Sequence, residues 1–159
     1  MGWGLSKGVG GSCCCPPQFD GLDGAALDAF AAATGIPVVV TQAGKGAILD
    51  AHPSCLGAVG VTGTAASNAL AGSADVILAV GTRLQDFTTG SWALFQNAEK
   101  TIIGLNTQVF DATKHRALPL VADARVGLEE LSANLAGWAA PKAWTSHGHS
   151  VPTRSFSTS

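Results

Sequence analysis

Short, mainly apolar segments rich in β-branched residues recur along this chain of 159 residues, and they constrain its fold more than any other feature. Residues 38–41 contain three valines and a threonine, residues 75–80 contain two valines and an isoleucine, and residues 101–105 contain two isoleucines. Such runs suit strands that are buried on both faces of a parallel sheet. A further strand is predicted at residues 118–122.

Segments with helical spacing of apolar residues lie between these strands. Helices are predicted at residues 23–34, 64–71 and 126–135, where alanines and leucines supply the apolar faces. Strands that alternate with helices through short connections form a parallel sheet with right-handed crossovers. The predicted fold class is therefore α/β, with a Rossmann-like parallel sheet flanked by helices.

The two ends of the chain lack these patterns. Residues 1–22 are rich in glycine and contain three adjacent cysteines, which predicts an irregular segment and a sheet whose first strand is missing. Residues 139–159 are rich in serine and threonine, which predicts a disordered tail. Residues 23–138 would then be the folded domain. A partial or frame-disrupted gene would account for both ends.

No metal site is predicted from the cysteines or histidines. Adjacent residues cannot easily direct all their sulfurs at one ion, so the triplet Cys13, Cys14 and Cys15 is a poor zinc ligand set. His147 and His149 have suitable spacing, but no third ligand lies in an ordered segment beside them.

Composition excludes several classes of partner. Charged residues make up 13% of the chain, against about a quarter in an ordinary domain, which suggests that part of the surface contacts another body. The net charge of −2 gives no reason to expect nucleic acid or an anionic membrane. The apolar runs are too short to span a bilayer. The N-terminus lacks the apolar core of a secretory signal, which favours the reducing cytoplasm, so the four cysteines suggest no disulfide framework.

The most informative loop follows the strand predicted at residues 75–80. Gly81 lets the backbone leave the sheet, and Thr82 and Arg83 come next. Because ligands of open α/β sheets bind beyond the carboxyl ends of the strands, Arg83 is well placed to bind a carboxylate or phosphate. An ion pair between Arg83 and Asp86 is the equally weighted alternative.

Two more glycine-containing loops are candidates for ligand binding. Lys45 follows the strand at residues 38–41, where it either reaches an anion or forms the solvated tip of its loop. Residues 60–64 precede a helix and could receive a phosphate, but they lack the spacing of a dinucleotide or P-loop motif, and tight turns are the commoner reason for such glycines. The candidate cofactor-binding residues are Gly44, Lys45, Gly60, Thr62, Gly63, Thr64, Gly81, Thr82 and Arg83.

No catalytic residue is proposed, because no Ser-His-Asp arrangement, HExxH motif or pair of carboxylates can be defended. His52 and His115 have no nucleophile beside them in the sequence.

Several blocks, taken in order, resemble the central domain of thiamine-diphosphate-dependent enzymes. They are residues 29–38, 41–46, 56–64, 80–83 and 111–115, within a resemblance that covers about residues 23–138. Residues 85–92 and 120–124 are similar to the trihydroxycyclohexane-dione hydrolases of inositol catabolism. Acetohydroxyacid synthases share the outline and are the nearest alternative.

The resemblance implies the middle domain of a three-domain enzyme. In that family thiamine pyrophosphate and Mg²⁺ lie between the pyrimidine- and pyrophosphate-binding domains, and the full enzyme is expected to be a homo-oligomer. The implied activity of the parent enzyme is the hydrolytic C–C ring opening of a cyclic diketone in myo-inositol degradation. The chain itself would be a non-catalytic scaffold, inactive alone. The alternatives are a synthase-like domain that binds FAD or an adenine nucleotide, and a truncated remnant without ligand.

Overall fold

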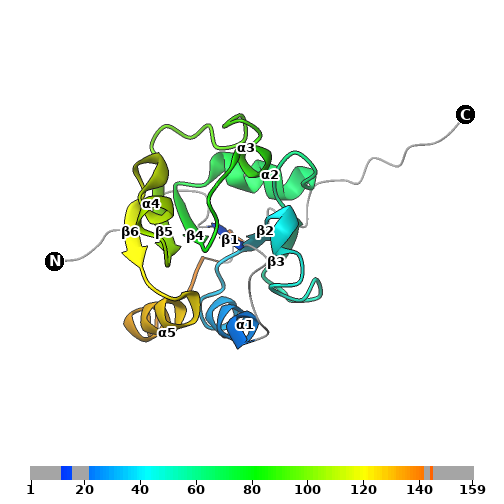
Figure 1. The fold of residues 1–159 in the computed structure, drawn as a ribbon. Helices are drawn as coiled ribbons and strands as arrows, with labels where there is room; N and C mark the ends of the chain where they lie inside the picture. The colour runs from blue at the N-terminus through cyan, green and yellow to red at the C-terminus, as the bar shows by residue number, and fades with distance from the viewer. Residues whose placement is uncertain (1–11, 16–21, 142–143, 145–159) are drawn as a thin grey trace, which may run out of the picture.

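The computed structural model describes residues 12–15, 22–141 and 144, and these form a doubly wound α/β domain (Figure 1). Six strands pair in parallel in the order β3-β2-β1-β4-β5-β6. The strand order therefore reverses between β1 and β4. The strands are β1 (Ser12–Cys15), β2 (Val38–Val40), β3 (Cys55–Ala58), β4 (Val76–Val80), β5 (Thr101–Asn106) and β6 (Leu118–Val121).

Helices cover both faces of the sheet. In Figure 1, α1 and α5 lie side by side below the sheet, and α2 and α3 lie above it. The helices are α1 (Leu22–Thr34), α2 (Ala65–Ser73), α3 (Asp86–Thr89), α4 (Val109–Ala112) and α5 (Ala124–Asn134), with short 3₁₀ turns η1 (Gln42–Gly44) and η2 (Lys114–Arg116).

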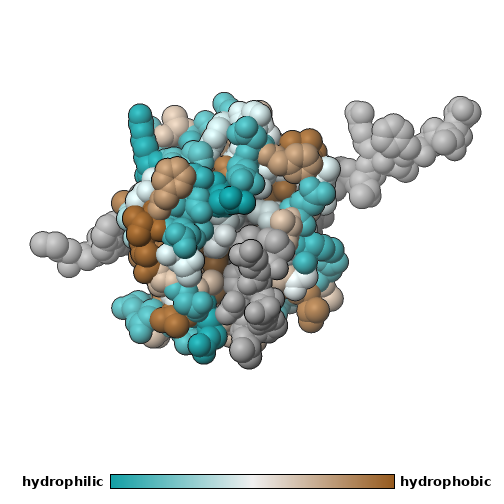
Figure 2. All heavy atoms as spheres, in the orientation of Figure 1, coloured by the Kyte–Doolittle hydropathy of each residue, from teal (hydrophilic) through white to brown (hydrophobic). Residues whose placement is uncertain are grey.

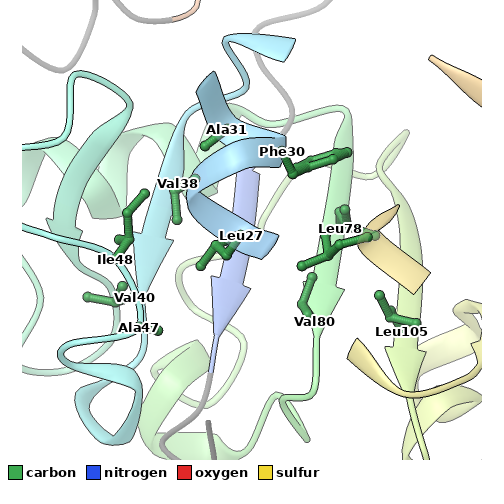
Figure 3. Close-up of a cluster of buried hydrophobic side chains, with 11 residues drawn as sticks. Leu27, Phe30, Ala31, Val38, Val40, Ala47, Ile48, Leu78, Val80 and Leu105 are labelled. Atoms are coloured by element: carbon green, nitrogen blue, oxygen red, sulfur yellow. The ribbon is translucent and has the colours of Figure 1, made fainter. Parts of the chain in front are cut away.

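Alternation along the central strands divides the core into two clusters. Val38, Val40, Leu78 and Val80 face α1 and α5, where they pack with buried residues such as Leu27 and Phe30 of α1 (Figure 3). The intervening residues of the same strands face the other side, where they pack with Leu70 and Ala71 of α2. This two-sided burial explains why β2 and β4 are continuous apolar runs.

The prediction that residues 1–22 contain no strand is wrong. Ser12–Cys15 forms β1, which pairs with β2 on one side and β4 on the other, in the centre of the sheet. The first strand is therefore present. Cysteine behaves as a small apolar residue, so three in a row could have been recognised as a short strand instead of an oxidisable loop.

Other predictions hold with small changes in their bounds. Strands lie at four predicted places, and helices lie at the three predicted places. The sequence did not predict β3, which directly precedes the glycine-containing loop at residues 60–64. Within the segment predicted as a tail, the Ala140 N–H donates to the Thr34 carbonyl, so residue 140 is tied to the end of α1. His147 and His149 lie outside the described residues.

The two-sided core makes a simple stability prediction. Leu105 of β5 is fully buried in the cluster beneath α1 and α5, so Leu105→Ala should lower the free energy of unfolding by about 2 to 5 kcal/mol. Leu49→Ala is the matched control, because Leu49 is 74% exposed and should change stability by no more than about 0.5 kcal/mol. Urea denaturation measures both. Similar effects for the two variants would contradict this packing.

Candidate functional site

A polar cavity of about 440 Å³ opens beyond the carboxyl ends of β2, β4 and β5. It lies where the strand order reverses, which is the usual ligand-binding position in an open α/β sheet. Its volume falls within the range of small-molecule sites. The described residues that line it are Thr41, Ala43, Gly81, Thr82, Arg83, Gln85, Thr88, Asn106, Gln108 and Asp111.

Two buried neighbours fix the position of Arg83 at this cavity. Gly81 turns the chain out of β4 with a φ of 61°, and its N–H still donates to the Leu105 carbonyl at 2.6 Å. Thr82 and Leu84 are buried, and the Thr82 hydroxyl accepts the Leu84 N–H at 3.2 Å. Arg83, between them, is exposed and lines the cavity.

The charges around the cavity favour an anionic ligand. Asp111 is paired with Lys114 at 2.9 Å, so its charge is balanced within the protein. Among the described residues Arg83 has no ion-pair partner, and the predicted alternative of a pair with Asp86 is not formed. A guanidinium with free donors at a polar cavity can bind a carboxylate or phosphate.

The second predicted loop contributes less than expected. Lys45 pairs with Asp50, with Nζ 2.6 Å from Oδ1, and both side chains are mostly exposed. Lys45 therefore forms the solvated tip of its loop, away from the described cavity wall. Gly44 is buried, and its N–H donates to the Thr41 hydroxyl at 3.0 Å, so Thr41 and Ala43 line the cavity instead.

The third predicted loop packs against its neighbours. A Cβ on Gly60 would lie 2.7 Å from the Phe87 carbonyl oxygen, and one on Gly63 would lie 2.7 Å from that of Ala58. The Thr64 hydroxyl caps α2 by accepting the Ser67 N–H at 3.1 Å. Thr62 is exposed. Gly60, Thr62, Gly63 and Thr64 are not among the described residues that line the cavity.

The sequence analysis did not predict that the end of β5 and the residues after it line the cavity. Asn106 ends β5, and its Oδ1 accepts the Gln108 N–H at 3.0 Å, which turns Gln108 toward the cavity. The signal was available, because a polar Asn at the carboxyl end of an apolar parallel strand lies at the edge where such sheets bind ligands. Gln85 and Thr88 were missed because they follow Arg83 in a loop of special backbone geometry.

His115 connects the Arg83 loop to the turn before β6. Its ring centroid lies 4.2 Å from that of Trp92, and the backbone of Arg83 and Leu84 lies beside it. Burial of the ring and the adjacent Lys114 cation lower the pKa of His115, against the opposing effects of the Arg83 and Leu84 backbone and the Asp86 carboxylate. A second hollow, of about 680 Å³, lies beside His115 and shares Arg83 and Gln85 with the first.

Three aromatic residues that follow Arg83 in the sequence differ in their exposure. Phe95 is buried in the core beside α2, and Trp92 is half-buried between Phe95 and His115. Phe87 is 49% exposed and lines the second hollow.

The described residues offer no metal centre and no spanning helix. No three of their His, Cys, Asp and Glu side chains gather closely enough to hold a metal ion. None of the helices in the described ranges has the length and apolar character needed to cross a membrane.

The fold and the cavity define a doubly wound α/β domain with a polar cavity at the switch point. The chain belongs to the family of thiamine pyrophosphate enzyme central domains, which matches residues 23–131. This confirms the resemblance seen in the sequence. A family of central domains also implies a multidomain enzyme that depends on thiamine pyrophosphate.

Three relatives place the chain within this family. It is 47% identical over 112 residues to the 3D-(3,5/4)-trihydroxycyclohexane-1,2-dione hydrolase of Clostridium perfringens, a match that covers 70% of the chain and 18% of that protein. It is 50% identical over 103 residues to the enzyme of the same name from Geobacillus thermodenitrificans, covering 65% and 16%. A Bacillus cereus hydrolase is 48% identical over 102 residues, covering 64% and 16%. The chain thus spans less than a fifth of the length of these relatives.

The His115 environment makes stability depend on pH. Because the folded state lowers the pKa of His115, the unfolded chain binds this proton more readily, so the contribution is full above about pH 6.5 and is lost as pH falls through the folded pKa. His115→Asn should reduce the loss of stability between about pH 7.5 and 5.5, since Asn tolerates the φ of 59° but does not titrate. Urea melts at both pH values measure the difference. An unchanged difference would show that this ring does not control the pH dependence.

Proposed function

We propose that this chain acts as the central domain of a thiamine pyrophosphate-dependent hydrolase that opens the ring of trihydroxycyclohexane-1,2-dione in the breakdown of myo-inositol. The observation that carries this proposal is the identity of 47–50% to hydrolases of that name, within a family match that covers most of the chain.

In this proposal the cofactor is held by other parts of the enzyme. Mg²⁺ requires several oxygen ligands in near-octahedral geometry, and the described residues bring together no suitable acidic cluster. They therefore do not fit a metal-bound diphosphate, and no step of the reaction is assigned to them. Pyrimidine- and pyrophosphate-binding domains would hold the cofactor and its Mg²⁺ and would form a homo-oligomer with this domain in the cytoplasm.

A domain exchange tests this role directly. Residues 23–131 would replace the matching segment of the Clostridium perfringens hydrolase, and the chimaera should hydrolyse trihydroxycyclohexane-1,2-dione within about tenfold of the parent rate, about 1.4 kcal/mol in barrier. The same chimaera with Leu105→Ala is the control for correct folding. A folded, cofactor-loaded chimaera without activity would refute the assignment. Turnover by the 159-residue chain alone would refute the scaffolding role.

A second candidate function is supported by the cavity at the switch point. As in the acetohydroxyacid-synthase-like alternative, the domain would bind FAD or an adenine nucleotide, with a phosphate on Arg83. The unpaired guanidinium, the amides of Asn106 and Gln108 and the hydroxyl of Thr88 are suitable donors. The described lining contains no aromatic side chain to stack on a base. The cavity residues would therefore bind the phosphate and sugar of the nucleotide and not its base. A remnant without ligand is the remaining alternative.

Matched charge removals test the nucleotide site. Arg83→Ala should weaken ADP or FAD binding by about 1.5 to 3 kcal/mol, because it removes a charge-assisted hydrogen bond. Lys45→Ala removes the same charge outside the cavity wall and should leave the affinity unchanged. Isothermal titration calorimetry of the two variants and the unaltered chain gives the comparison. Equal losses would show only a general effect of charge, and no binding by the unaltered chain would exclude the site.

A further inference from the structure

The described wall of the cavity at the switch point carries one unbalanced charge, that of Arg83. Arg83 has no ion-pair partner among the described residues, whereas the Asp111 carboxylate lies 2.9 Å from Lys114 Nζ. A second negative charge on a ligand would meet no further cation in the described lining and would lie near Asp111. The wall therefore suits a ligand with a single negative charge, which favours a carboxylate over the more highly charged phosphate group.

Neutral hydrogen-bonding side chains supply most of the remaining wall. The Asn106 Oδ1 accepts the Gln108 N–H, and the amide nitrogen of Asn106 has no partner among the described residues. The same holds for the side chains of Gln85, Thr88 and Gln108, which also line the cavity. Amides and hydroxyl groups both donate and accept, so they suit the hydroxyl groups of a ligand.

The place and size of the cavity narrow the ligand further. Figure 2 shows hydrophilic atoms across the visible face between the positions that Figure 1 gives for α4 and α3, and the lining residues Asp111 and Thr88 belong to these two helices. The volume of about 440 Å³ lies toward the lower end of the roughly 300 to 1,000 Å³ of ligand pockets. A short hydroxylated chain with one carboxylate matches this size, charge and polarity.

The reaction proposed above makes a molecule of this class. When water opens trihydroxycyclohexane-1,2-dione between its two carbonyl carbons, that C–C bond breaks, one of these carbons takes the hydroxyl group of water and the other takes the hydrogen. The product is an open-chain six-carbon molecule with an aldehyde, three hydroxyl groups and a carboxylic acid. At about pH 7 the acid has lost its proton, so the product carries one negative charge.

We propose that this cavity binds an open-chain polyhydroxy carboxylate, with the carboxylate on Arg83 and the hydroxyl groups on Thr88, Asn106 and Gln108, and that the ring-opened product is its ligand in the intact enzyme. The ligand class rests on the cavity, and its link to the product rests on the proposed hydrolase function. A nucleotide would need the same guanidinium, so the two kinds of ligand exclude each other.

NMR titration of the ¹⁵N-labelled 159-residue chain with D-gluconate tests the ligand class, because D-gluconate is an open-chain polyhydroxy carboxylate. It should shift the side-chain signals of Arg83, Asn106 and Gln108 with a dissociation constant on the order of 1 mM. D-Glucitol has the hydroxyl groups without the carboxylate, and hexanoate has the carboxylate without the hydroxyl groups. Each should bind at least about tenfold more weakly than D-gluconate.

Three variants test the contacts one at a time. Arg83→Ala should weaken D-gluconate binding at least about tenfold, because it removes the charge-assisted hydrogen bonds. Thr88→Val removes one hydroxyl group at nearly constant volume and should weaken binding about two- to tenfold. Lys45→Ala is the matched control, since Lys45 pairs with Asp50 outside the described lining, and it should leave the affinity unchanged. Circular dichroism would confirm that each variant is folded.

Several results would overturn the ligand class. They are no shift at about 20 mM D-gluconate, equal binding of D-gluconate and D-glucitol, or an affinity that Arg83→Ala leaves unchanged. ADP that binds without competition from D-gluconate would also overturn it, in favour of the nucleotide.

The link to the reaction has its own measurement. The ring-opened product, made with the Clostridium perfringens hydrolase, should bind this chain at least as tightly as D-gluconate. Weaker binding would overturn the product as the ligand. An inactive chimaera beside normal D-gluconate binding would refute the hydrolase function and the link to the product, and would leave the ligand class standing. An active chimaera from a chain that does not bind D-gluconate would refute only the inference drawn from the cavity.

Discussion

Parallel pairing of β4 with β5 is the interaction on which both the core and the candidate site depend. The two strands pair over five residues, from Val76 with Thr101 to Val80 with Leu105, and Val80 and Leu105 are fully buried. The hydrogen bond from the Gly81 N–H to the Leu105 carbonyl extends this pairing beyond β4. Asn106, the next residue of β5, therefore lies opposite Gly81, two residues before Arg83, and both segments line the same cavity. The same contact that excludes water from the core thus brings the polar residues of the cavity together.

The loop after β4 reaches its shape through unusual backbone angles. Leu84 and Trp92 have positive φ values of 45° and 67°, which L-residues rarely adopt, and the facing His115 has one of 59°. Such conformations persist only where surrounding contacts stabilise them. Burial of the Leu84 side chain and the packing of the His115 ring on Trp92 provide that stabilisation. The position of Arg83 therefore depends on a side chain that follows β5, more than thirty residues later in the sequence.

The sequence predicted most of the sheet, because short apolar runs of β-branched residues favour buried strands over helices or loops. It also placed Arg83 just beyond the end of β4, where the residue lines the cavity, since its position after a buried strand is set by chain order alone. It could not place Lys45, whose ion pair with Asp50 depends on how its loop folds back. It missed β1 and β3, because Ser12–Cys15 has no β-branched residue and β3 contains Gly57, so neither resembles an ordinary strand. Local composition was misleading where a strand is held mainly by its neighbours.

The presence of β1 changes what the domain can do by itself. A sheet without that strand would leave β2 and β4 with unpaired backbone groups in the middle of the molecule. With β1 in place, β2 and β4 are paired on both sides, and the ends of the sheet are β3 and β6. The exposed apolar residues Leu118 and Val121 of β6 therefore cannot be explained by an incomplete sheet. They belong to a sheet that already contains its central strand, so a strand added beside β6 would extend the sheet and would not complete it.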